Sequence, residues 1–164
     1  MSPAASVPGE AVTFDRLAPG PADTVGLGRV FGRSSPDGAV ILLEGGLGAG
    51  KTTFAQGVAE GCGVPGPVSS PTYNLVLHHD GRRPLVHADF YRLVGPEELE
   101  TLDLEEILSP RGLAVVEWPE LVADRASPPY AVVSLFREDA GRRIAGRLIG
   151  PGWSAVREAL EAGG

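Results

Sequence analysis

The sequence has one cysteine, Cys62, and no apolar run that approaches the roughly 20 residues needed to cross a bilayer. A lone cysteine can form no internal disulfide and supplies no thiolate cluster for a metal, so we expect a buried structural thiol. The opening residues, MSPAASVPGE, contain neither the basic nor the apolar region of a secretory signal. These absences favour a soluble, cytoplasmic protein with no membrane segment.

Positive charge is also scarce. The chain carries 14 basic and 21 acidic residues, which gives a formal net charge of −7. Such a surface repels nucleic acid, so direct and independent RNA binding is disfavoured. All of the basic residues except Lys51 are arginine. Lysine is a compact point charge on a thin stem, whereas arginine is a planar fork, so position 51 is expected to need the former.

The length of 164 residues suits one domain with one compact core. We expect residues 1–164 to form this domain, with a short flexible stretch at 1–10. Apolar patterning predicts an α/β fold in which strands and helices are interspersed. The predicted strands are 11–14, 39–43, 74–77, 85–88, 113–116, 131–136 and 143–149, and the predicted helices are 22–31, 52–60, 96–108 and 154–162.

A glycine-rich loop joins a predicted buried strand to a predicted helix. Its spacing, Gly45-x-x-x-x-Gly50-Lys51-Thr52, satisfies the motif G-x-x-x-x-G-K-[ST] in the context that this motif requires. Glycines allow positive φ, so successive N–H groups can form an anion nest, and the helix start adds partial positive charge. Lys51 would lie against the β- and γ-phosphates of a nucleotide, and the Thr52 hydroxyl would bind Mg²⁺. The predicted nucleotide-binding residues of this loop are Gly45, Gly46, Leu47, Gly48, Ala49, Gly50, Lys51, Thr52 and Thr53.

A P-loop enzyme usually needs an acidic residue at the end of a neighbouring strand to hold the Mg²⁺ shell or to orient water. Asp89 follows one predicted strand and Glu117 follows another, and the pattern does not rank them. GTP-specific proteins commonly carry an N-K-x-D loop, but the only asparagine, Asn74, precedes a leucine. ATP is therefore the expected nucleotide, and no metal beyond Mg²⁺ is implied. The histidines lack zinc-ligand spacing and are interpreted as loop or strand residues: His78, His79 and His87.

Four segments that follow one another along the chain carry a family resemblance. LGAGKTTF (47–54), SPTY (70–73), HADFYRL (87–93) and VVEWPE (115–120) resemble the bacterial TsaE family, over roughly residues 22–149. The resemblance implies a P-loop NTPase-like three-layer fold with a mixed, partly parallel central sheet. It also implies weak ATP hydrolysis that becomes productive with TsaB-like and TsaD-like partners, in a complex that makes threonylcarbamoyladenosine in tRNA. The chain would meet tRNA only through that complex.

The resemblance assigns catalytic roles by position. Lys51 and Thr52 would bind phosphate and Mg²⁺, and Thr52 would share the metal with an acidic pair, Asp89 and Glu117. Thr72, in the SPTY segment, would correspond to a switch-like residue near the γ-phosphate.

The same resemblance places Trp118 near the nucleotide and Thr24 near its base. The chain also departs from the usual family residues. Gly46 stands where the family usually has an acidic residue, so the loop gains flexibility and loses a charge. Ala88 and Leu121 are the other departures.

Two other functions remain open. Many small-molecule kinases are P-loop proteins of this length, and they usually close an arginine-bearing lid over the phosphates. Arg82–Arg83 and Arg142–Arg143 are candidates for such a lid, but each pair lies in a predicted hairpin. The second alternative is an interaction module with negligible turnover, in which ATP orders a surface that a partner recognises.

Overall fold

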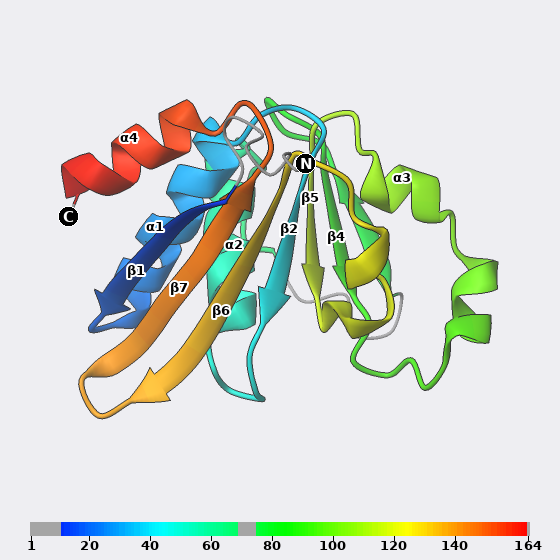
Figure 1. The fold of residues 1–164 in the computed structure, drawn as a ribbon, viewed down its shortest axis with the longest axis horizontal. Coiled ribbons are helices and arrows are strands. Elements are labelled where there is room, and N and C mark those ends of the chain that lie inside the picture. The colour runs from blue at the N-terminus through cyan, green and yellow to red at the C-terminus, as the bar shows by residue number, and fades with distance from the viewer. Residues whose placement is uncertain (1–10, 69–74, 164) are drawn as a thin grey trace, which may run out of the picture.

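The structure, a computed structural model, describes residues 11–68 and 75–163. The predicted flexible stretch 1–10 and the predicted switch residue Thr72 lie outside these ranges. Within them the chain forms a seven-stranded sheet with helices on its faces (Figure 1). The strands are β1 (Val12–Ala18), β2 (Ala39–Glu44), β3 (Val76–His79), β4 (Leu85–Asp89), β5 (Leu113–Glu117), β6 (Tyr130–Glu138) and β7 (Gly141–Ile149). The α-helices are α1 (Pro21–Ser34), α2 (Lys51–Gly61), α3 (Leu104–Leu108) and α4 (Ser154–Gly163), and the 3-10 helices are η1 (Pro96–Thr101), η2 (Pro119–Leu121) and η3 (Ala123–Arg125).

The sheet is mixed, with the strand order β1-β7-β6-β2-β5-β4-β3. The central strands β6, β2, β5 and β4 are parallel. β3 pairs antiparallel at one end of the sheet, and β7 and β1 do so at the other. β2 and β5 have neighbours on both sides and are buried on both faces, which is why both are continuous apolar runs. The predicted α/β fold with a mixed, partly parallel sheet is confirmed.

Helices cover the sheet on both faces and make a three-layer arrangement. α1 and α2 lie on one face, and α4 packs against α1 (Figure 1). This layer closes over an apolar cluster that includes Phe31 and Phe54. On the other face, η1 and α3 contribute Leu99 and Ile107 to a second cluster over β2, β4 and β5. No helix in the described ranges combines the length and the apolar composition that a bilayer crossing demands.

The predicted helix 96–108 is wrong as a single element. The chain forms η1 and then α3, with a break at Asp103. Asp103 Oδ1 accepts a hydrogen bond from the Glu106 backbone N–H at 3.2 Å, which caps the start of α3. Short polar side chains favour such caps over helix interiors, because they bond to nearby backbone groups.

Glycines bring α1 and α2 into backbone contact. A Cβ on Gly28 would lie 2.2 Å from the Phe54 carbonyl oxygen, and one on Gly57 would lie 2.2 Å from the Val25 carbonyl oxygen. No side chain fits at either position, so glycine sets the distance between the two helices. Because α2 begins at Lys51, this contact also holds the end of the glycine-rich loop in place.

Cys62 lies directly after the last residue of α2 and contacts α1. Its side chain is fully buried, and its Sγ lies 3.5 Å from the Gly32 carbonyl oxygen. The prediction of a buried structural thiol is confirmed.

Gly28→Ala is expected to lower the free energy of unfolding by about 1–3 kcal/mol, because the added methyl group forces α1 and α2 apart. Gly26→Ala in the same helix is the matched control, since a Cβ there meets no atom within 4 Å. That variant should be stabilised by up to about 1 kcal/mol through the higher helix propensity of alanine. Urea denaturation measures both effects, and equal values would contradict the close helix contact.

Burial raises the pKa of the Cys62 thiol to about 11, against the opposing effect of Arg83 and Arg82. The native thiol is therefore expected to resist Ellman's reagent at mildly alkaline pH and to react fully once urea unfolds the chain. The unfolded thiol loses its proton first, so stability should also fall as the pH rises from about 9 toward 11. Cys62→Ala should abolish this loss. Rapid labelling of the folded protein would show that the thiol is accessible.

Candidate functional site

The loop between β2 and α2 has the backbone that its glycines predict. Gly45, Gly48 and Gly50 have φ of 150°, 78° and 111°, a region that favours glycine. At Gly45 a side chain is also excluded by contact, because a Cβ would lie 2.7 Å from the Leu135 carbonyl oxygen. A Cβ on Gly46, in contrast, meets no atom within 4 Å. Space alone therefore does not explain glycine at position 46, where the resemblance leads to an acidic residue.

Lys51 begins α2, and its side chain folds back into the loop. Its Nζ donates hydrogen bonds to the carbonyl oxygens of Gly45 at 2.6 Å and Gly46 at 2.9 Å, and lies 4.0 Å from the centroid of the Trp118 ring. Burial lowers the pKa of Lys51, while nearby carboxylates, Glu117 foremost, act in the opposite direction. The ammonium group is thus removed from water and held by carbonyls and a ring face, which are weaker partners than an anion.

The two acidic candidates, Asp89 and Glu117, lie next to each other at the ends of neighbouring strands. The parallel register of β4 and β5 pairs Asp89 with Glu117, so both lie at the carboxyl-terminal edge of the sheet. Glu117 is 2% exposed, and its Oε1 accepts a hydrogen bond from Thr52 Oγ1 at 3.3 Å. Asp89 is less buried, and its Oδ1 accepts a hydrogen bond from the Tyr91 backbone N–H at 3.0 Å. Glu117 therefore makes the contact with α2, a distinction that the sequence pattern does not make.

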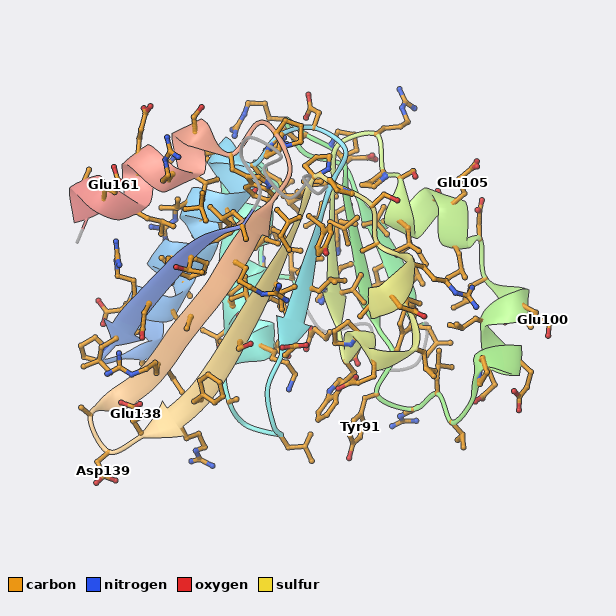
Figure 2. All side chains as sticks on the ribbon, in the orientation of Figure 1. Tyr91, Glu100, Glu105, Glu138, Asp139 and Glu161 are labelled. Carbon is orange, nitrogen blue, oxygen red and sulfur yellow. The ribbon has the colours of Figure 1, made fainter. Side chains whose placement is uncertain are left out.

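Trp118 and Tyr91 form an aromatic pair beside the loop. Trp118 has φ of 55°, which is uncommon outside glycine, and the chain turns there directly after β5. The centroids of the two rings lie 4.8 Å apart. Tyr91 is 52% exposed and points outward where β4 and β5 end (Figure 2). Strained backbone of this kind clusters at binding and catalytic sites.

These side chains line one cavity of about 370 Å³. It lies at the carboxyl-terminal edge of the parallel strands, which is the usual location of ligand sites in α/β sheets. The cavity is lined by Leu47, Gly48, Gly50, Lys51, Thr52, Thr53, Asp89, Tyr91, Glu117, Trp118 and Arg142. A second cavity of about 210 Å³ shares Gly50, Thr53 and Arg142 with the first and is also lined by Thr24, which is 1% exposed on α1.

The structure thus brings most of the predicted residues together. The predicted residues that line the first cavity are Leu47, Gly48, Gly50, Lys51, Thr52, Thr53, Asp89, Glu117 and Trp118. Thr24 lies at the second cavity, and Gly45, Gly46 and Ala49 belong to the loop without lining either cavity. Thr72 lies outside the described residues.

The predicted site residues do not include three that the structure places at or behind the cavity: Tyr91, Arg142 and His87. Tyr91 lies in the segment HADFYRL and lines the first cavity. Arg142 is the second residue of β7, lines both cavities and donates from Nη2 to the Gly48 carbonyl oxygen at 3.2 Å. The sequence indicates Arg142 only as part of the Arg142–Arg143 pair offered for a kinase lid. Its contact with Gly48 spans 94 positions, which no short motif reveals.

His87 was expected to be a loop or strand residue and does lie in β4, but it also contacts Glu117. Its signal is the spacing of two from Asp89, which puts both side chains on one face of a strand.

No all-protein metal cage occurs in residues 11–68 and 75–163, where no group of three or more histidine, cysteine, aspartate or glutamate residues is placed to hold an ion. This includes a separate cavity of about 290 Å³ between β3 and α3, which is lined by histidines and carboxylates. Mg²⁺ does not require such a cage, since it usually combines one or two carboxylates with phosphates and water.

Comparison with known proteins gives one consistent family. A family model described as "Threonylcarbamoyl adenosine biosynthesis protein TsaE" matches residues 18–145. The chain is 39% identical over 124 residues to the tRNA threonylcarbamoyladenosine biosynthesis protein TsaE of Treponema pallidum, with 74% of this chain and 91% of the relative covered. It is 34% identical over 142 residues to the protein of the same name from Bacillus subtilis, with 85% and 89% covered.

A solved structure agrees with the sequence matches. The crystal structure of Bacillus subtilis YdiB is similar to this fold with a TM-score of 0.77 and 28% sequence identity, over 93% of this chain and 97% of that one. The chain therefore belongs to the TsaE family of tRNA threonylcarbamoyladenosine biosynthesis proteins.

Proposed function

We propose that this chain is a single-domain ATPase that binds and hydrolyses ATP with Mg²⁺ at the cavity beside the glycine-rich loop. Its ATPase cycle supports a TsaB/TsaD-type transferase complex that forms threonylcarbamoyladenosine in tRNA. The observation that carries the proposal is the convergence of Lys51, Thr52 and Glu117 on one cavity. An ammonium, a hydroxyl and a carboxylate group at the start of a helix are what phosphate and Mg²⁺ binding need.

The two adjoining cavities suit the two ends of a nucleotide. The phosphates lie in the larger cavity, at the amino-terminal end of α2, where the helix dipole and free N–H groups favour an anion. Lys51 exchanges its carbonyl partners for phosphate oxygens, because an anion is the stronger acceptor. The base lies in the smaller cavity beside Thr24 and Arg142, where a guanidinium group can stack on a purine.

The donor set fits a Mg²⁺ ion that arrives with the nucleotide. Thr52 Oγ1 and the Glu117 carboxylate would hold it, with Asp89 on the same edge of the sheet. When bound, the ion supplies positive charge to the β- and γ-phosphate oxygens.

The protein side chains position the reactants and do not form bonds to them. Lys51 offsets the negative charge of the γ-phosphate, and Glu117 stays engaged with Thr52. Asp89 is the more exposed carboxylate and is the one that orients the attacking water. Trp118 and Tyr91 limit the access of bulk water to the phosphates.

The proposal also accounts for dependence on partners. Leu47 is 68% exposed and Tyr91 is 52% exposed at the mouth of the cavity, where a partner protein can cover the nucleotide. Excluding water there strengthens the interactions on which hydrolysis depends. The net charge of −7 disfavours direct contact with tRNA, so the chain meets tRNA through the complex.

The two alternative functions differ in measurable ways. A small-molecule kinase transfers phosphate to a metabolite faster than to water, and an interaction module binds ATP without turning it over. Single-turnover hydrolysis with and without TsaB-like and TsaD-like proteins separates these cases. The decisive experiment is the reconstitution of tRNA modification, and an equal rate without this chain or without ATP would refute the proposal.

Lys51→Ala is expected to weaken ATP binding by about 10- to 100-fold, because a hydrogen bond to a charged group contributes about 1.5–3 kcal/mol. Lys51→Arg should not restore the affinity, since a planar fork does not match the compact ammonium group. Titration with a fluorescent ATP analogue measures both variants. If Lys51→Ala supports tRNA modification at the wild-type rate, the assigned role of Lys51 is wrong.

Arg142→Ala is expected to weaken ATP binding by about 10-fold, through the loss of one charged contact at the cavity. Arg147→Ala is the matched control, because Arg147 lies on the same strand and is exposed away from both cavities. The same titration compares them, and thermal melting checks that both variants fold. An equal affinity of the two variants would exclude Arg142 from the nucleotide site.

A further inference from the structure

His87 and Glu117 form a buried pair behind the candidate metal site. His87 Nε2 lies 2.7 Å from Glu117 Oε2, and the two side chains are 2% and 3% exposed. Other ion pairs of the described residues, such as Arg29–Glu60, have one or both side chains well exposed to solvent. The surroundings of this pair are therefore dry, and the bond is not weakened by water.

The sheet register explains how the two side chains meet. In β4 and β5, His87 is paired with Val115 and Asp89 with Glu117, so His87 is the diagonal neighbour of Glu117. The alternation of side chains along β4 puts His87 on the same face as Asp89. A histidine at this position therefore points along the sheet toward the carboxylate at the end of the next strand.

The two oxygens of Glu117 have different partners. Oε1 accepts the hydrogen bond from Thr52 Oγ1, and Oε2 lies 2.7 Å from His87 Nε2. A carboxylate only accepts hydrogen bonds, so His87 Nε2 carries the hydrogen. The bond from His87 thereby fixes the rotation of the carboxylate and directs Oε1 toward Thr52.

The other ring nitrogen of His87, Nδ1, indicates that a histidine at this position does not stabilise the fold. Among the described residues, His87 Nδ1 is buried and has no hydrogen-bond partner. A buried polar atom without a partner opposes folding, and an apolar side chain in the same space would avoid that cost. The polar contact that justifies a histidine here is the one with Glu117.

We propose that His87 is a positioning residue that holds Glu117 in the orientation needed to bind the Mg²⁺ of the nucleotide complex. The inference rests on the function proposed above. Carboxylates that bind metals are usually oriented by a second hydrogen bond, and removal of the partner typically costs about 10- to 100-fold in metal affinity. His87 contributes to Mg²⁺ affinity and not to nucleotide affinity as such, because it lines neither cavity.

The test compares two variants of His87 whose side-chain amide groups differ in their distance from the backbone. In His87→Gln the side-chain nitrogen takes the place of Nε2 and can still donate to Glu117, whereas in His87→Asn it takes the place of Nδ1 and cannot. His79→Asn is the matched control, because His79 also has a buried ring nitrogen without a partner among the described residues but lies on β3 away from Glu117. Affinity for a fluorescent ADP analogue is measured in EDTA and over a Mg²⁺ titration.

We expect Mg²⁺ to change the affinity for the ADP analogue in wild type, His87→Gln and His79→Asn, and the half-maximal change to occur at similar Mg²⁺ concentrations in all three. His87→Asn should need about 10- to 100-fold more Mg²⁺, with its affinity in EDTA unchanged. An unchanged Mg²⁺ midpoint in His87→Asn overturns the inference, as does an equal loss of affinity in EDTA and in Mg²⁺. If His87→Asn does not fold, His87→Phe makes the same comparison, since its ring fills the buried space without a donor.

The outcome for wild type separates this inference from the function on which it rests. If wild type binds no nucleotide, the proposed function fails and the inference fails with it. If wild type binds nucleotide with a clear Mg²⁺ dependence and the variants match it, only the role of His87 is wrong.

Discussion

Parallel pairing of β2, β5 and β4 is the constraint on which the site depends. Their register aligns Leu43 with Glu117 and Glu117 with Asp89, so the glycine-rich loop and both carboxylates leave the sheet at one edge. A slip of one residue in β5 would turn Glu117 to the opposite face, because side chains alternate along a strand. Because β2 and β5 are buried on both faces, such a slip would also mismatch their side chains against the close-packed layers on either side. Burial of the sheet therefore sets the position of the charged groups.

The helix layer fixes the other half of the site. α2 carries Lys51 and Thr52 at its first turn, and backbone contact at Gly28 and Gly57 holds it against α1. Interiors packed this closely transmit small displacements. A change of the helix contact far from the cavity would therefore move Thr52 relative to Glu117, a contact of 3.3 Å that joins the two layers.

The buried ionisable groups at the site do not favour the stability of the fold. Lys51, His87 and Glu117 are each at most 5% exposed, and buried ionisable groups rarely stabilise a fold over apolar ones of similar size. Lys51 is held by carbonyl oxygens and the Trp118 ring, and burial lowers its pKa. The function that we propose accounts for these groups, because the nucleotide would bring a dense negative charge to Lys51 and Mg²⁺ would bring a cation to Glu117.

The sequence by itself determined the elements that depend on local chemistry. The spacing of Gly45, Gly50 and Lys51 identified the loop, and the apolar run 39–43 identified the strand before it, because both depend on neighbouring residues alone. Local reasoning failed where a competing local bond intervened, as at Asp103, which caps a new helix inside the predicted helix 96–108. Only the tertiary structure decided which distant groups share the site. It distinguished Glu117 from Asp89 by contact with Thr52, added Arg142 from the hairpin, and set His87 behind Glu117. These relations depend on strand order and register, which follow from burial of the whole sheet and not from any short segment.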